Sequence, residues 1–245
     1  MLLMYRYFFL LILVVLLAAG TAIAEGEKLL LVGSGEPDPK DILLVDYLEE
    51  WGYEIEFREH LAKHPGNLAG IDFVFISEST SSANILDAYK DSAIPVVNAE
   101  TWTYDDMGFA PDGTFNSDAG DDLTIVNSDH PITEGFKDKI TVSKPAVSLM
   151  TCNGFEGDID VLAVRADNDD FVAISVYEKG AKTIKGSTKT RHVNIWPHST
   201  GWQMVTDDGW ELIHRSILYA LGQIPFDVAP EDKLTVTWGQ IKKWR

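Results

Sequence analysis

Cysteine is almost absent from this chain, which carries Cys152 as the only one among its 245 residues. A single thiol cannot form an internal disulfide, so the fold must depend on a packed apolar core. Apolar residues make up 45% of the sequence, and a chain of this length is able to bury such a core. We interpret Cys152 as a buried structural thiol at a strand end, because a nucleophile would need a nearby histidine that the sequence cannot place.

Basic residues are also scarce, with 20 Lys and Arg against 38 Asp and Glu and a formal net charge of −18. Nucleic acids and anionic lipid surfaces would repel so acidic a protein, so we expect no nucleic-acid partner. The charge has two interpretations, namely solubility in an extracytoplasmic space or binding of calcium or another cation. We favour the first and predict no metal site.

Long apolar runs are missing apart from one at residues 7–19, which follows Arg6 and ends before the stretch Ala22-Ile23-Ala24. A basic start, a short apolar run and a small-x-small end are typical of a cleavable signal peptide. A membrane-spanning helix would need about 20 apolar residues. We therefore predict a signal peptide at 1–24, a secreted or periplasmic location, and no membrane association after cleavage.

Alternating strand and helix patterns occupy the first half of the remaining chain. Strands are predicted at 28–34, 53–57, 72–77 and 94–97, and helices at 37–52 and 81–89. This order indicates a parallel sheet with crossover helices, which is an α/β fold.

The second half has a different pattern. Residues 111–122 read as a surface loop, and a series of short strands follows, some of them hairpins, at 123–126, 140–142, 161–165, 171–177 and 182–184. A last core strand is predicted at 193–196 and a helix from Asp207 to Gly222. We predict one domain at 25–224, followed by a linker and C-terminal tail at 225–245.

Several strings, in their order along the chain, resemble the class I glutamine amidotransferase-like superfamily, which includes ThuA-like domains. They are LLLVGSG, WGYEIE, IDFVFISES, IPVVNAE, DHPITEGF and VYEKG. The resemblance covers roughly residues 28–222 and is nearest to secreted bacterial modules attached to carbohydrate-active or surface proteins. It implies a flavodoxin-like, three-layer α/β fold with a parallel sheet, crossover helices and an added antiparallel hairpin region.

The catalytic triad of that superfamily is not found at the matching positions. The resemblance places a cysteine nucleophile after the strand at 94–97, where this chain has Glu100. A His-Pro-Glu string is expected at the end of the late strand, where this chain has Trp196-Pro197-His198. An indole cannot act as a base, so glutamine hydrolysis by this route is not expected.

The site at this elbow could still bind a ligand, because ligands of open α/β sheets lie beyond the carboxyl ends of the strands. Hydroxyl, carboxylate and indole groups there would suit a sugar or another small polar molecule. The candidate ligand-binding residues are Ser34, Ser77, Glu78, Ser79, Glu100, Trp102, Trp196 and His198. The alternative is that the serines and glutamates cap helices and the tryptophans close the core.

The stretch His130-Pro131-Ile132-Thr133 is similar to a recurrent string of ThuA-like domains. Asp129 or His130 can cap a short helix that begins at Pro131, and a catalytic His130 is the alternative.

Three further motifs do not indicate a cofactor site or a metal site. Glu36 and Asp38 would repel a pyrophosphate at the Gly33-Ser34-Gly35 loop. His60 and His64 are interrupted by Pro65-Gly66, and the acidic stretch at 167–170 lacks the glycine and distal glutamate of a calcium loop. We predict no cofactor.

The function that we favour is an exported, non-catalytic binding or structural module, carbohydrate-associated or bound to an envelope protein. The first alternative is a ThuA-like enzyme acting on a sugar or small polar substrate, with Glu100 as general base and His130 or His198 as its partner. The second is a structural spacer whose partner docks on the C-terminal tail.

Overall fold

A sheet that is parallel in one half and antiparallel in the other runs through the computed structural model, which describes residues 26–35, 37–60 and 65–224. The strands of the parallel half are, in spatial order, β2 (Glu54–Glu59), β1 (Lys28–Gly33), β3 (Phe73–Ile76), β4 (Val96–Asn98) and β15 (His192–Asn194). The first strand lies between the second and third, as in flavodoxin-like sheets. The predicted α/β fold is confirmed.

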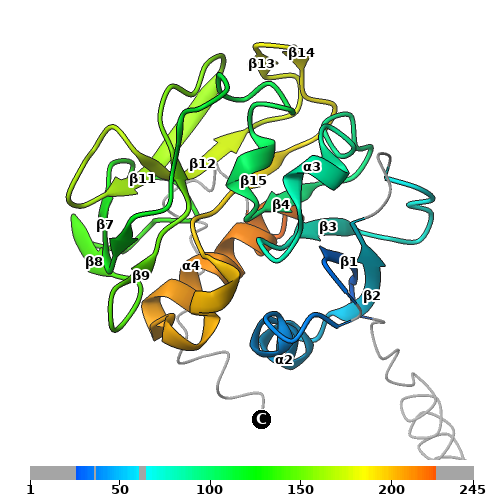
Figure 1. Cartoon of the computed structure of the whole chain (residues 1–245), viewed down its shortest axis with the longest axis horizontal. Coiled ribbons are helices and arrows are strands. Elements are labelled where there is room, and N and C mark those ends of the chain that lie inside the picture. The colour runs from blue at the N-terminus through cyan, green and yellow to red at the C-terminus, as the bar shows by residue number, and fades with distance from the viewer. Residues whose placement is uncertain (1–25, 36, 61–64, 225–245) are drawn as a thin grey trace, which may run out of the picture.

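The antiparallel half of the sheet is made by the chain between β4 and β15. It continues from β15 through β12 (Val172–Tyr177), β11 (Ile159–Arg165), β7 (Asp122–Ile125) and β8 (Lys139–Thr141). Shorter pairings join β10 (Thr151–Cys152) to β12 and β5 (Phe115–Asn116), β6 (Ala119–Gly120) to β9 (Val147–Ser148), and β13 (Lys182–Thr183) to β14 (Gly186–Ser187). Figure 1 shows how this half extends the sheet away from β1 and β2.

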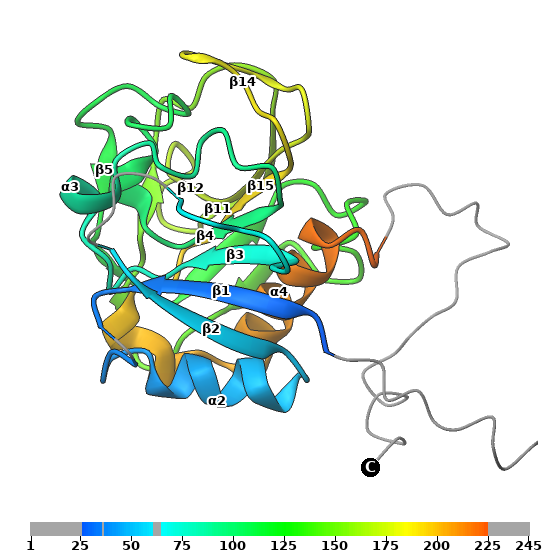
Figure 2. The ribbon, with the colours of Figure 1, turned by 90° about the vertical axis from the view of Figure 1, so that its right-hand side faces the viewer.

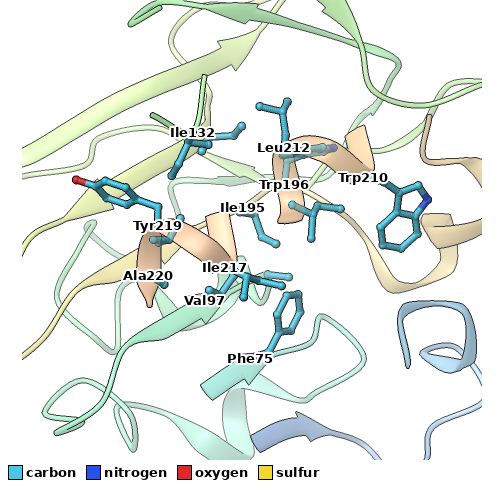
Figure 3. Close-up of a cluster of buried hydrophobic side chains, with 14 of the residues drawn as sticks. Phe75, Val97, Ile132, Ile195, Trp196, Trp210, Leu212, Ile217, Tyr219 and Ala220 are labelled. Carbon is cyan, nitrogen blue, oxygen red and sulfur yellow. The ribbon is translucent and has the colours of Figure 1, made fainter. Parts of the chain in front are cut away.

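Two helices, α2 (Ile42–Glu50) and α4 (Asp207–Ala220), cover one face of the sheet (Figure 2). Because α4 has apolar residues at helical spacing, Leu212 and Ile217 are buried in the cluster between the helix and the sheet, where Ile217 lies beside Phe75 (Figure 3). Thr206 begins the helix, and its hydroxyl accepts a hydrogen bond of 3.2 Å from the N–H of Gly209.

The other face carries a separate apolar cluster beneath short elements, α3 (Ser82–Ile85) and the 3₁₀ turn η1 (Thr101–Thr103). The helix predicted at 81–89 is therefore too long. Leu86 has a φ of 47°, which a continuing α-helix cannot accommodate, and hydrogen-bonded turns follow it. The predicted loop at 111–122 also contains the two short strands β5 and β6.

Among the described residues, no helix combines the length and the apolar character needed to cross a membrane. The predicted signal peptide at 1–24 and the tail at 225–245 lie outside those residues, so both stay predictions.

Candidate functional site

The carboxyl ends of β1, β3, β4 and β15 lie side by side at one edge of the sheet, because these strands are parallel neighbours. The residues that follow them carry most of the predicted site. Three of the predicted side chains form one cluster there: Glu78 after β3, Glu100 after β4 and His198 after β15. The other candidates have separate environments.

Glu78 is the centre of this cluster. One of its oxygens, Oε2, accepts hydrogen bonds from the N–H of Ser199 at 3.0 Å and from the Ser199 hydroxyl at 2.6 Å. The other, Oε1, lies 3.1 Å from Nε2 of His198. Glu78 thereby holds the first residue of η2 (Ser199–Met204) against the end of β3.

The hydrogen bonds of His198 define which ring nitrogen carries the proton. Its Nδ1 accepts from the N–H of Thr200 at 3.1 Å, so a neutral ring has its proton on Nε2, facing Glu78. Both nitrogens are engaged in positioning η2. One side of the ring borders a small depression shared with Leu149, Pro197 and Gly201.

Glu100 occupies the elbow after β4, where it is only 2% exposed. Its Oε1 accepts from the N–H of Trp102 at 3.1 Å and so caps η1, while its own N–H donates to Asn98 Oδ1 at 2.9 Å. Burial, together with the negative charge of Glu78, raises the pKa of Glu100 to about 9. The carboxyl therefore holds its proton at neutral pH and is a proton donor rather than a base.

Ser77 and Ser79 face a different acid, Asp41, at the N-cap of α2. Asp41 is buried, and its carboxylate accepts from the hydroxyls of both serines and from Nε1 of Trp202, the last at 3.2 Å. Burial raises the pKa of Asp41, and these three hydrogen bonds counteract the rise. The two serines therefore join α2, β3 and η2 inside the protein instead of facing a ligand.

Asp41 was missed as a site residue, and its one local signal is an acid directly before an apolar helical run. Gly33 makes room for it, because a Cβ there would lie 3.1 Å from Asp41 Oδ2 and 3.0 Å from Ser79 Oγ. Ser34, the next candidate, donates its hydroxyl hydrogen to Asp38 in the following turn.

The two candidate tryptophans lie in opposite environments. Trp196 is 1% exposed and packs in the cluster between the sheet and α4 (Figure 3). Trp102 is 45% exposed, and its ring centre lies 4.7 Å from that of Phe115 on β5.

His130 lies away from this edge of the sheet. It is buried, its Nδ1 accepts from the N–H of Ile132 at 3.2 Å, and its ring meets Tyr219 edge-on at 4.4 Å. Tyr219 is in the last turn of α4, next to Arg191, which precedes β15. Burial lowers the pKa of His130 to about 4. His130 caps its own turn at the opposite edge and cannot act together with Glu100.

The remaining motifs have structural roles. His60 Nδ1 accepts from the N–H of Ser81 at 3.3 Å, and His64 lies outside the described residues. The acidic stretch at 167–170 forms the turn between β11 and β12, where Asp167 pairs with Arg165 at 2.7 Å. Within the described ranges, no group of three or more His, Cys, Asp or Glu side chains is arranged to hold a metal ion.

Cys152 is fully buried on β10, 3.2 Å from the hydroxyl oxygen of Thr114. Burial raises the pKa of its thiol to about 11, so the thiolate needed for nucleophilic attack is scarce at neutral pH.

Comparison with known proteins supports the fold. No family model matches the sequence, and no curated protein is similar to it at a significant level. A Thermoplasma acidophilum protein described as a GMP synthase component aligns with a TM-score of 0.50 and 12% identity, over 81% of this chain and 95% of that chain. PurLQS from Thermotoga maritima aligns with a TM-score of 0.45 and 15% identity, over 79% of this chain and 99% of that one.

A glutamine amidotransferase from Thermotoga maritima is also similar, with a TM-score of 0.44 and 8% identity over 80% of this chain and 83% of that chain. At these identities the likeness concerns the fold alone. The chain has the α/β fold of class I glutamine amidotransferase-like proteins.

Proposed function

We propose that this chain is an exported, non-catalytic binding module with the amidotransferase-like fold, and that its ligand is a carbohydrate. The observation that carries the proposal is the state of Glu100. A nucleophile at this elbow would have to be exposed and ionised, whereas Glu100 is 2% exposed, keeps its proton and caps η1.

The position that would hold the base supports the same conclusion. Trp196 packs in the core with an indole that cannot accept a proton. His198, two residues later, has both ring nitrogens engaged, one by Thr200 and one by Glu78. The proposed module uses the polar residues after β3 and β4 to join η1 and η2 to the sheet.

Export is part of the proposal and rests on the sequence pattern of residues 1–24. Cleavage would remove Arg6, the single charged residue of that segment, and take the formal net charge from −18 to −19. Expression of the chain with and without residues 1–24, followed by fractionation and N-terminal sequencing, tests it. Retention of the uncleaved chain in the cytoplasm would contradict export.

A glutaminase assay tests the absence of catalysis. Purified full chain is incubated with glutamine, and ammonia release is compared with that of the Glu100→Gln variant. We expect both to match the buffer blank. Ammonia release by the wild type that the substitution abolishes would overturn the proposal.

One observation favours a second candidate, a ThuA-like enzyme acting on a sugar or small polar substrate. Glu78 and Glu100 are neighbouring carboxyls whose environments separate their behaviour, as in many acid–base sites. The protonated Glu100 would then donate a proton, and the general-base role expected from the sequence would not apply at neutral pH. Turnover of a sugar that is lost in Glu100→Gln would favour this enzyme over the module.

A further inference from the structure

The outer edge of β2 has no partner strand in the part of the chain that the structure describes. β2 is the outermost strand of the parallel half and pairs with β1 alone (Figure 1). The N–H groups of Glu54 and His60 donate to β1, so these alternate residues direct their backbone groups inwards. Ile55, Phe57 and Glu59 direct theirs outwards, and no backbone hydrogen bond of the described residues reaches them. A row of free backbone donors and acceptors is a template for another strand.

The two faces of β2 carry different side chains. Ile55 and Phe57 are half-buried and pack against the apolar cluster that the sheet forms with α2 and α4. Glu56 and Arg58 project from the opposite face, because side chains alternate along a strand. Arg58 donates to the Asn67 carbonyl at 3.1 Å and lies 3.1 Å from Glu56 Oε1, so its guanidinium is held over this face. β2 thus has an apolar stripe on one face and a negative charge next to a positive charge on the other.

The edge of β2 is complementary to itself. Two antiparallel copies of the strand, related by a two-fold axis, pair their outward-facing residues with each other. With Phe57 opposite its own copy, Glu56 of each chain lies opposite Arg58 of the other. An axis at Glu56 or at Arg58 would set that residue against itself, and an axis at Ile55 would set Glu54 against Glu56. Opposite charges across two strands stabilise the pair and like charges destabilise it, so the charges select the register centred on Phe57.

We propose that two copies of this chain associate through β2, with Phe57 at the two-fold axis and one continuous sheet running through both copies. Ile55, Phe57 and Glu59 of each copy exchange about six backbone hydrogen bonds with the same residues of the other. The two half-buried Phe57 rings shield each other from water, and Glu56 pairs with Arg58 on both sides of the axis. The partner of this edge is a second copy, because the charges and the apolar stripe of β2 fit β2 itself.

The acidity of the chain weakens this association at low ionic strength, because each copy carries a net charge of −18. Salt at about 0.15 M screens exposed charges that are more than about 8 Å apart, whereas Glu56 and Arg58 meet directly across the paired strands. The inference goes beyond the proposed binding function and does not depend on it. Because the paired strands are antiparallel, the elbows of the two copies face opposite directions.

Sedimentation velocity of the purified full chain, over a range of concentrations at about 0.15 M salt, tests the pairing. We expect a concentration-dependent dimer in the wild type. Arg58→Glu and Glu56→Lys each set like charges opposite one another across the axis, so each should raise the dissociation constant at least about tenfold. An equimolar mixture of the two variants should dimerise again, because the acidic strand of one then faces the basic strand of the other.

Charge reversals in an ion pair of α4, between Glu211 and Arg215, are the matched controls. The two side chains are partly exposed, as are those of Glu56 and Arg58. Arg215→Glu and Glu211→Lys change the net charge by the same amounts as the substitutions on β2, and both should dimerise like the wild type. A wild type that stays monomeric at every concentration would overturn the proposal, and so would dimers that survive Glu56→Lys.

Glu56→Lys keeps the test decisive if Arg58→Glu does not fold. The Glu56 side chain is 40% exposed, and the substitution removes only its surface contacts with Lys28 and Arg58. Circular dichroism spectra establish which variants fold. Loss of the pairing would leave the proposed binding module standing, because no residue of β2 belongs to the elbow.

Discussion

Glu100 and Glu78 lie beside each other at the ends of β4 and β3, and the charge of Glu78 adds to the effect of burial on the pKa of Glu100. The two acids have different tasks. Glu78 accepts hydrogen bonds from Ser199 and contacts His198, while Glu100 stays protonated and caps η1. Glu78 and Glu100 can lie this close together because Glu100 is neutral and therefore does not repel Glu78.

This relationship predicts how stability depends on pH. The pKa of Glu100 is about 9 in the folded chain against an ordinary value of 4.5, so between these values the folded state binds more protons. The free energy of unfolding therefore falls as pH rises, by about 1.4 kcal/mol per pH unit from this group. The contribution is complete below pH 4.5 and is lost as pH passes about 9.

Glu100→Gln should remove this dependence, because an amide cannot ionise and its oxygen can still accept the Trp102 N–H. Urea unfolding at pH 5 to 9 measures the slope. Glu49→Gln, at an exposed position of α2, is the control and should keep the wild-type slope. Equal slopes in the wild type and Glu100→Gln would show that Glu100 is ionised in the folded chain.

Gly33→Ala should destabilise the protein by about 1 to 3 kcal/mol. The new methyl group would lie 3.0 Å from Ser79 Oγ and 3.1 Å from Asp41 Oδ2, inside the buried network at the end of β1. Gly35→Ala is the matched control, because nothing lies within 4 Å of its Cβ position. Chemical denaturation gives both values, and a Gly33 variant as stable as the Gly35 variant would mean that the network shifts without cost.

Arg165→Lys should cost about 3 kcal/mol. The side chain of Arg165 is 3% exposed, pairs with Asp167 through two nitrogens, and donates to the carbonyls of Asp118 and Ala119 and to Asn116. A lysine ammonium cannot reproduce this planar set of donors.

The control for this substitution is Arg215→Lys on α4, which pairs with Glu211 four residues away and donates to the Glu134 carbonyl at a partly exposed surface. That change should cost less than about 0.5 kcal/mol. Urea denaturation of the two variants gives the loss in the free energy of unfolding for each. Similar losses in both would argue against a special role of Arg165.

Cys152 should be inert towards thiol reagents in the folded protein. It is buried and the pKa of its thiol is about 11, so labelling at pH 8 should occur only when the chain unfolds. Because the chain has one cysteine, the labelling rate reports directly on opening of β10. Labelling in native buffer as fast as in urea would place the thiol at the surface.

The parallel strands could be predicted because strands buried on both faces have continuous apolar runs, as at Phe73–Ile76. The two-residue strands β5, β6 and β9 could not, since their pairing depends on distant partners. The helix predicted at 81–89 is shorter in the structure because of tertiary packing. Tyr89 packs into the core below Ile85, and the chain reaches it through turns.

The sequence predicted where the candidate site lies, but it did not predict which side chains contact one another there. The strand order placed Glu78, Glu100 and His198 at one edge of the sheet. The partners of Asp41 could not be foreseen, because Ser77 and Trp202 are 36 and 161 residues away along the chain. Nor could the sequence show that Trp196 faces the core while Trp102 faces solvent, because both follow a strand.

The beginning of β1 and the end of α4 lie next to each other at the edge opposite the elbow, where Gln223 donates a hydrogen bond to Glu27 (Figure 2). A short glycine-serine linker would therefore span the gap between these two points without strain. The folded unit could be circularly permuted, or carried as an insert in a surface loop of another protein, with Trp102 directed away from its host.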